Sequence, residues 1–229
     1  MRAQATAGSS EKGYIGTPME GVIARWYARI RGSSSQIAGW KKQAAELTAD
    51  LPDGADILEV APGPGYFSLE MARLGRFHVT GLDISHTFVE IARENARRAR
   101  LRVDFREGDA SSLPFADGSF AFIICQAAFK NFSRPGDVLN EMYRVLCPEG
   151  TAVIQDMNRD TNGADINLEV RQMEIGPLNA FMTRRSLGML RRRAYSVKQF
   201  ATLARESAFG GARITTNGIG LEVRLTKES

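Results

Sequence analysis

The sequence has few of the residues that build metal centres or disulfide frameworks. Its 229 residues include only two histidines, His78 and His86, and two cysteines. Cys125 lies in an apolar run and Cys147 follows an apolar helical segment, so we expect two buried thiols rather than a disulfide. No cluster with metal-ligand spacing is present, and we expect no bound metal. This cysteine usage favours a cytoplasmic protein.

Long hydrophobic runs are also missing. No apolar run approaches the roughly 20 residues that span a bilayer, so we expect no stable membrane insertion. Residues 1–13 lack the apolar stretch of a secretory signal and are predicted to be a disordered lead-in to one domain at 14–229. The formal net charge is +4, but the arginines are spread over most predicted helices without interleaved aromatics. The sequence therefore predicts no nucleic-acid partner.

The most informative stretch is a short apolar run followed by a turn rich in glycine and proline. Residues 57–60 are typical of a buried strand, and the residues from Tyr66 onward are typical of a helix. Gly63 and Gly65 tolerate positive φ and let the backbone come close to a ligand. The free amides of the new helix then face the crevice beyond the strand. The pattern indicates a nucleotide-type loop in a doubly wound α/β domain; a tight turn without a ligand is the alternative.

Two common nucleotide-binding loops are absent from this stretch. The dinucleotide fingerprint needs a third glycine where this chain has Ser68, and the lysine-containing phosphate loop is missing. What remains is an acid that ends the strand, Glu59, then a small residue, any residue, Gly, any residue and Gly. This order resembles the first motif of the class I S-adenosylmethionine-dependent methyltransferases. Ala61 stands where that family most often has its first glycine.

A second acidic residue follows at the spacing of the next strand end. Residues 77–83 are predicted to form a strand that ends in Asp83, about 18 residues after Gly65. A carboxylate there can accept hydrogen bonds from both ribose hydroxyls of a nucleoside, with Ile84 beside it. Ser85 is predicted to cap the helix that follows, and capping that helix is the alternative role of Asp83.

The resemblance becomes specific after the third predicted strand, residues 101–106. Gly-Asp-Ala, Leu-Pro-Phe and Asp-Gly-Ser-Phe follow it in that order. This segment is similar to the adenine-binding segment of small-molecule methyltransferases. The resemblance implies that Asp109 accepts from the adenine amine and that the Ala110 amide serves the ring. The family usually has an Asp where this chain has Ala121, which we interpret as a strand position.

The resemblance covers about residues 55–157, and it looks closest to the ubiquinone/menaquinone-biosynthesis-like branch. It implies S-adenosyl-L-methionine as the cofactor and a doubly wound, mostly parallel seven-stranded sheet. The closing strands, 212–215 and 221–226, flank an Asn-Gly link and suit a C-terminal antiparallel hairpin. We predict cofactor contacts in the glycine loop and at the strand ends: Glu59, Ala61, Pro62, Gly63, Gly65, Tyr66, Asp83, Ile84, Asp109, Ala110 and Gln126.

Helical segments flank this core. Residues 14–52 are predicted to form two helices that pack on the sheet edge or fold over the cofactor as part of a lid. Residues 161–194 are an apolar, methionine-rich helical insertion, predicted to be a lid over a pliable pocket or, alternatively, packed on the core. Its basic stretch, 184–193, is either a solvated face or a site that attracts an anionic acceptor or a membrane surface.

Methyl transfer requires an oriented acceptor and the exclusion of water, and a base only where the acceptor must lose a proton. Residues 122–125 are predicted to form the fourth strand. In the loop that follows it, Lys130 is the candidate base and Asn131 the candidate for orienting the acceptor. Ordinary solvated loop residues are the alternative. Phe129, with Phe181 and Met182 of the insertion, is predicted to bind the acceptor.

Three functions remain open at this point. The leading hypothesis is a cytoplasmic enzyme, either monomeric or homodimeric, that methylates a small, partly apolar molecule. A nicotinamide-dependent dehydrogenase is disfavoured by Ser68 and because Tyr195 and Lys198 are three residues apart rather than four. The third is a protein that binds S-adenosylmethionine without catalysis. The loop after the fourth predicted strand lacks the Pro-Pro-aromatic feature of enzymes that methylate nucleobase amines. We therefore do not expect a nucleobase amine as the acceptor.

Overall fold

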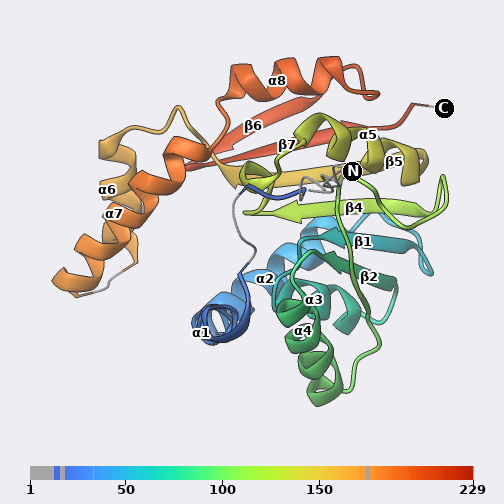
Figure 1. The fold of residues 1–229 in the computed structure, drawn as a ribbon, viewed down its shortest axis with the longest axis horizontal. Coiled ribbons are helices and arrows are strands. Elements are labelled where there is room, and N and C mark those ends of the chain that lie inside the picture. Colours follow the sequence, from blue (N-terminus) through green and yellow to red (C-terminus); the bar gives the residue numbers. More distant parts are fainter. Residues whose placement is uncertain (1–12, 16–18, 33, 174–175, 229) are drawn as a thin grey trace, which may run out of the picture.

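The computed structural model describes residues 13–15, 19–32, 34–173 and 176–228. A seven-stranded sheet in the order β3-β2-β1-β4-β5-β7-β6 runs through its centre (Figure 1). The first five strands along the chain pair in parallel, and the last two form an antiparallel hairpin beside β5. The strands are β1 Asp56–Val60, β2 His78–Asp83, β3 Asp104–Glu107, β4 Phe120–Gln126, β5 Leu146–Met157, β6 Arg213–Asn217 and β7 Gly220–Thr226.

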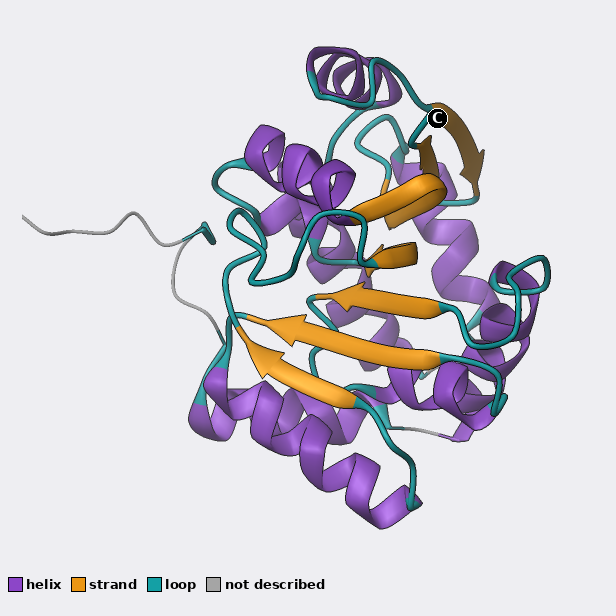
Figure 2. Cartoon of the chain, turned by 90° about the vertical axis from the view of Figure 1, so that its right-hand side faces the viewer, coloured by secondary structure: helices purple, strands orange, loops and turns teal. Residues whose placement is uncertain are grey.

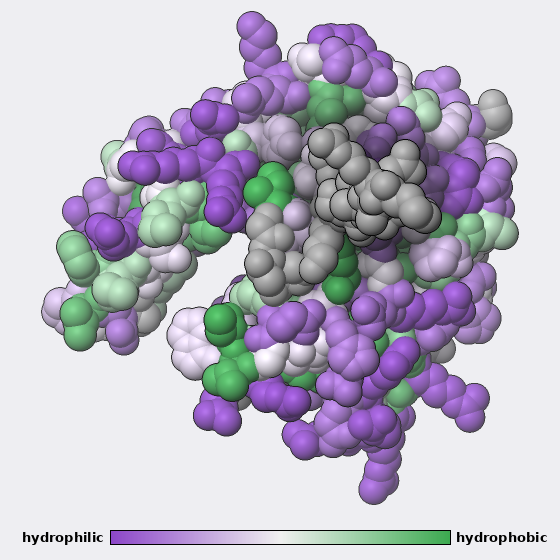
Figure 3. Space-filling view, viewed as in Figure 1, coloured by the Kyte–Doolittle hydropathy of each residue, from purple (hydrophilic) through white to green (hydrophobic). Residues whose placement is uncertain are grey.

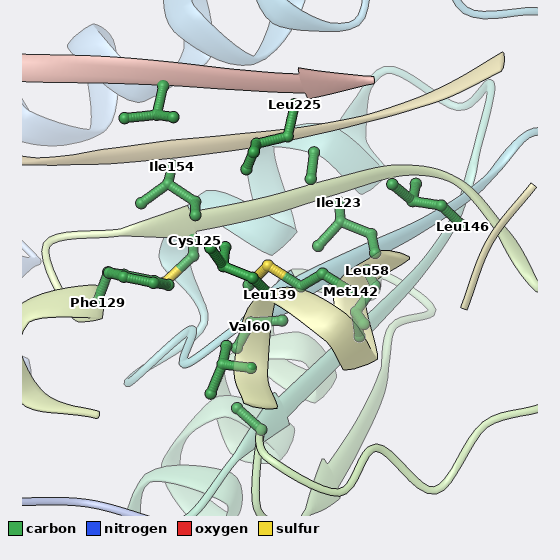
Figure 4. Close-up of a cluster of buried hydrophobic side chains, with 14 of the residues drawn as sticks. Leu58, Val60, Ile123, Cys125, Phe129, Leu139, Met142, Leu146, Ile154 and Leu225 are labelled. Atoms are coloured by element: carbon green, nitrogen blue, oxygen red, sulfur yellow. The ribbon is translucent and has the colours of Figure 1, made fainter. Parts of the chain in front are cut away.

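Helices cover both faces of the sheet (Figure 2). One face carries α2 and α3, whose buried side chains pack on β1 and β4, and the other carries α5 and α8. Figure 4 shows part of the core under α5 and α8, where Leu139 and Met142 of α5 meet Leu58 and Ile123 of the sheet. The helices are α1 Gly21–Arg31, α2 Ser34–Leu47, α3 Tyr66–Arg73, α4 His86–Ala99, α5 Pro135–Val145, α6 Gly163–Gln172, α7 Pro177–Arg193 and α8 Val197–Glu206, with a 3-10 turn at Phe129–Asn131.

The register of the central strands sets the position of the candidate site. Val60, the last residue of β1, pairs with Leu82 of β2 on one side and with Cys125 of β4 on the other. The apolar runs of these strands are buried on both faces, as expected for parallel strands between two helical layers. The residues at and just after the three strand ends therefore share one edge of the sheet.

The predicted seven-stranded sheet and its C-terminal hairpin are confirmed. The predicted strands lie within a few residues of their predicted bounds. β3 begins at Asp104 instead of residue 101, because Arg100, which caps the end of α4, lies in the left-handed region (φ 56°) and the chain must turn first. β5 begins at Leu146 and includes the Pro-Glu-Gly stretch at residues 148–150. There Glu149 takes a φ of 64°, and the pairing with β4 shifts register.

Helices lie within both flanking segments: α1 and α2 within residues 14–52, and α6 and α7 within 161–194. In the first, α2 packs on α3 and α1 packs on α4. In the second, α6 and α7 pack on each other and project beyond the end of β5 (Figure 1). Residues 1–12 of the predicted lead-in lie outside the described residues. Both cysteines are free thiols; Cys125 is buried, but Cys147 is only half-buried, which corrects the expectation for the second. Among the described residues, no helix is both long and apolar enough to cross a bilayer.

Candidate active site

A pocket lies beyond the carboxyl ends of β1, β2 and β4. Seven of the predicted cofactor residues line it: Ala61, Gly63, Asp83, Ile84, Asp109, Ala110 and Gln126. Pro62 and Tyr66, together with Glu59, line a smaller recess that shares Ala61 and Gly63 with the pocket. Gly65 lines neither. The structure thus brings the predicted strand-end residues together at one edge, as expected for a ligand site in an open α/β sheet.

The two glycines of the loop have different structural roles. Gly65 has a φ of 78°, and a Cβ there would lie 2.6 Å from Phe105 Cζ and 2.9 Å from the Ala92 Cβ. Its small size is therefore required by packing against β3 and α4. Gly63 has a φ of 55°, and a Cβ there would meet no atom within 4 Å. Ala61 adopts a φ of 57°, so the position where the resembled family usually has glycine keeps the left-handed backbone.

Asp83 joins the glycine loop to the second strand end. Its carboxylate accepts from the Gly63 amide and from the Ser85 amide, each at 2.9 Å. Burial raises the pKa of this carboxyl to about 6. The side chain of Ser85, not that of Asp83, caps α4 by accepting from the Phe88 amide. Asp83 therefore fixes the loop from inside the pocket.

Glu59 is a second buried carboxyl on the floor of the smaller recess. Its side chain is only 3% exposed and accepts from the Ser68 hydroxyl. Burial raises the pKa of Glu59 to about 7. Ser68, which replaces the third glycine of a dinucleotide loop, thus serves as a partner for the strand-end acid.

Asp109 lies where the chain near the N-terminus crosses the pocket. Its carboxylate accepts from the Gly13 amide at 3.1 Å and from the Ser111 amide at 2.8 Å. The Ile15 amide donates to the carbonyl of Asn131 at 2.7 Å, which holds this segment beside the loop after β4. Gly13, the last residue of the predicted lead-in, therefore donates a hydrogen bond to Asp109, the residue predicted to bind adenine.

Tyr14 and Tyr27 were not assigned to the site individually, yet both line the pocket. Burial raises the pKa of the Tyr14 hydroxyl, and nearby Asp83 adds to the effect. The aromatic enrichment ahead of the first strand was the available sequence signal. Since α1 carries Tyr27, it reaches the pocket, as the lid alternative for residues 14–52 requires, whereas α2 packs on the helical layer. The lid function itself stays a prediction.

A second pocket adjoins the first across the end of β4. Gln126 and Ala127 line both. The Gln126 amide donates to Gln43 at 2.9 Å and to Gln155 at 2.8 Å, so its orientation is fixed by neighbours on α2 and β5. Ala127 has a φ of 54°, a conformation that costs a non-glycine residue roughly 1–2 kcal/mol. Strained alanines thus end both β1 and β4 at the site.

The predicted catalytic residues point to different environments. Lys130 is buried, and its ammonium lies 2.7 Å from Asp156 Oδ1 and donates to the carbonyl of Ala127. Both contacts hold the ammonium against the chain rather than leaving it free in the loop. Lys130 lines the second pocket and Asn131 the first. Their catalytic roles stay predictions.

The predicted acceptor residues are not brought together. Phe129 is fully buried in the core, packed against Phe132 and Phe200, and Figure 4 shows it beside Cys125. Phe181 and Met182 are 60% and 57% exposed on α7 and line neither pocket.

The residues of α7 that do line the second pocket are Leu187 and Leu190, which the sequence did not single out. All four residues belong to the apolar pattern of the insertion. The orientation of α7 in the fold decides that Leu187 and Leu190 line the pocket while Phe181 and Met182 face solvent.

Arg31 is the clearest functional candidate that sequence reasoning missed. It ends α1 and lines both the second pocket and the smaller recess. Its guanidinium lies 4.9 Å from the centre of the Trp40 ring, and that ring stacks on Tyr66 at 5.8 Å. No motif marks it, because it is one of many arginines on predicted helices.

Comparison with known proteins finds a family that matches the central part of the chain. A methyltransferase-domain family matches residues 58–154, which include the glycine loop, both buried carboxyls and Asp109. Over these residues the chain is similar to the class I S-adenosylmethionine-dependent methyltransferases. The demethylmenaquinone methyltransferase of Deinococcus radiodurans is 35% identical over 127 residues, covering 55% of this chain and 52% of that protein.

Other relatives agree on the domain. The ubiquinone/menaquinone biosynthesis C-methyltransferase of Roseobacter denitrificans is 33% identical over 128 residues, covering 55% of this chain and 51% of that protein. The chain thus spans about half the length of the curated relatives it matches. A solved structure of a methyltransferase from Aquifex aeolicus shares the fold, with a TM-score of 0.66 at 17% identity over 88% of this chain and 97% of that one.

Proposed function

We propose that this chain transfers the methyl group of S-adenosyl-L-methionine to a small, partly apolar acceptor. One observation carries the proposal: the strand-end pocket and the second pocket share the wall formed by Gln126 and Ala127. A methyl donor in the first pocket would therefore lie next to a molecule in the second. Such adjacency is what a direct transfer between two bound molecules requires.

The residues of the strand-end pocket fit a nucleoside. Each oxygen of Asp83 accepts one backbone amide and keeps a lone pair for a ribose hydroxyl. The open space at the Cα of Gly63 leaves room for a ligand to approach the loop. Asp109 and Ala110 would receive the adenine ring. The Asp109 carboxylate would then accept from the ring amine as well as from the Gly13 and Ser111 amides.

The smaller recess fits the amino-acid end of the cofactor. Glu59 on its floor would face the ammonium group, and Arg31 at its rim would pair with the carboxylate. Pro62 and Tyr66 would enclose the chain between them. The bound cofactor supplies an activated methyl group on a sulfonium, so the protein needs to position the acceptor and exclude water.

The second pocket supplies the means to position an acceptor. Leu187 and Leu190 give it an apolar wall, and Trp40 lies opposite on α2. Gln126 donates a hydrogen bond to Gln155, and these two side chains offer fixed polar groups in its lining. This combination favours a flat, mostly apolar molecule with a few oxygen or nitrogen atoms.

The names of the relatives suggest where to begin the search for the acceptor. A demethylated isoprenoid quinone is the first candidate, because demethylmenaquinone and ubiquinone/menaquinone methyltransferases match the cofactor half of the chain. Residues Arg31, Trp40, Leu187 and Leu190 lie outside the family match at 58–154, so the acceptor side is the part that distinguishes this chain. We further propose a cytoplasmic location, no nucleic-acid partner, and lids at 14–52 and 161–194.

Two measurements test the proposal. Calorimetric titration should show binding of S-adenosylmethionine and its demethylated product but not of NAD, which would exclude the dehydrogenase alternative. Release of the demethylated product should then depend on an added acceptor from a panel of quinones, phenols and amines. Binding without turnover on any acceptor would instead support a protein that holds the cofactor without catalysis.

A further inference from the structure

One side of α7 exposes large apolar side chains to solvent. Leu178, Phe181, Met182 and Met189 have exposed fractions of 74%, 60%, 57% and 62%. Residues three, four and seven positions apart lie on the same face of a helix, so these four form one apolar stripe. An exposed cluster of this kind on a single face generally marks a surface of interaction.

Arginines are interleaved with this apolar stripe. Arg185 follows Phe181 by four residues and precedes Met189 by four, and it is exposed, as are Arg192 and Arg193. The whole of α7 contains no acidic residue that would neutralise them. The face is therefore both apolar and strongly cationic.

The outer side of α1 repeats the combination. Val22, Ile23 and Trp26 have exposed fractions of 82%, 62% and 63%. Arg25 and Arg29 are exposed beside them, and α1 also contains no acidic residue. Two helices far apart in the sequence thus carry the same rare pattern.

Both helices border the second pocket. Arg31 at the end of α1 and Leu187 and Leu190 of α7 line it. Figure 3 shows hydrophobic side chains over α1 and over the free end of the α6–α7 pair, on the same side of the molecule. The two faces therefore flank the entrance to the pocket that adjoins the strand ends.

We propose that the outer faces of α1 and α7 form a docking surface for an anionic lipid bilayer. Apolar side chains of an interfacial helix enter the boundary between headgroups and acyl chains. Arginines on the same face extend their guanidinium groups back to lipid phosphates. A second copy of this chain fits less well, because pairing either face with itself would bring arginines together without acidic partners.

The docking surface has a consequence for the acceptor. Since its two helices flank the second pocket, a lipid-dissolved acceptor would enter the pocket directly from the bilayer. This consequence rests on the proposed function, whereas docking itself is measured without any acceptor or turnover.

Sedimentation with lipid vesicles tests the docking surface. The full chain should bind vesicles of phosphatidylcholine mixed with phosphatidylglycerol, bind vesicles of phosphatidylcholine alone far more weakly, and release from the anionic vesicles as salt is raised. A chain that ignores anionic vesicles at low salt would overturn the proposal. So would concentration-dependent dimerisation that Phe181→Ala with Met182→Ala abolishes in the absence of vesicle binding.

Charge reversal on α7, with a matched control, distinguishes a docking face from general electrostatic attraction. A basic residue near an anionic surface contributes about fivefold to partitioning, so Arg185→Glu with Arg192→Glu should weaken binding at least tenfold. Lys198→Glu with Arg205→Glu makes the same charge change at exposed positions of α8. That control should stay within about twofold of the unmodified chain; an equal loss in both double variants would contradict a specific face.

Hydrophobic truncation supplies an independent test. Phe181→Ala with Met182→Ala removes two exposed side chains that no part of the core needs. Partitioning onto anionic vesicles should fall about tenfold, with the thermal unfolding midpoint unchanged. Unaltered partitioning would rule out insertion of α7.

Discussion

At the scale of single residues, the site depends on carboxyl groups that the fold buries at strand ends. Glu59 and Asp83 both have pKa values raised by burial, to about 7 and about 6. Each is the side chain that a parallel strand places at its carboxyl end, beside a loop with left-handed backbone. Burial disfavours the ionised forms of both carboxyls, and a cationic, hydroxyl-bearing ligand at this site would stabilise those forms.

The raised pKa of Glu59 predicts a pH dependence of stability. Because the folded state holds this proton to about pH 7 and the unfolded state loses it at the ordinary, lower value, the free energy of unfolding falls as pH rises between those values. Glu59→Gln keeps an acceptor for Ser68 and removes the titration. Urea unfolding at pH 5 and pH 8 should show that the substitution gains roughly 2–3 kcal/mol on the unmodified chain between the two. Parallel pH profiles for both proteins would contradict the burial of a titrating Glu59.

The glycine loop offers a paired test of packing against ligand approach. Gly65→Val would place side-chain atoms against Phe105 and Ala92 and should lower the thermal unfolding midpoint by several degrees or prevent folding. At Gly63 there is space for a side chain, although the positive φ costs about 1 kcal/mol.

Gly63→Val should therefore fold and yet bind S-adenosylmethionine at least tenfold more weakly, measured by calorimetry. Normal binding by a folded Gly63→Val variant would show that the ligand does not approach this loop.

At the scale of elements, the sequence predicts the features that a local residue pattern determines, and it does not predict those that depend on how helices pack. The strand ends were predictable because apolar runs are buried on both faces of the sheet, so the acids that end them must lie at one edge. Arg31 and Leu187 were not, because the direction of α1 and α7 depends on helix packing rather than on any motif. Phe129 reads as a ligand contact from its loop position, but its ring completes the core beside Phe200.

The direction of α7 separates acceptor residues from surface residues. Leu187→Ala with Leu190→Ala should raise the KM for a water-soluble acceptor at least tenfold, because both side chains line the second pocket, and leave the cofactor affinity unchanged. Phe181→Ala with Met182→Ala on the outer face is the matched control and should leave that KM unchanged. If KM instead rose only for the Phe181→Ala with Met182→Ala control, the outer face of α7 would bind the acceptor and Leu187 and Leu190 would not.

At the scale of the whole molecule, two pockets and a cationic, apolar surface lie at one end of a single sheet. The sheet fixes the first pocket through strand register, while α1, α2, α7 and the hairpin β6–β7 complete the second. The family match covers most of the lining of the first pocket and leaves most of the second outside it. The division explains why the cofactor chemistry follows from the sequence pattern, whereas the acceptor must be found by experiment.

The central claim, that the strand-end pocket binds S-adenosylmethionine through its buried carboxylate, is tested most directly by calorimetric titration of the Asp83→Ala variant. Loss of hydrogen bonds from two ribose hydroxyls to a charged acceptor, at roughly 1.5–3 kcal/mol each, should weaken binding at least tenfold. Asp104→Ala, which removes an exposed carboxylate from β3, should bind as the unmodified chain does. A folded Asp83→Ala variant with an unchanged dissociation constant would contradict the claim.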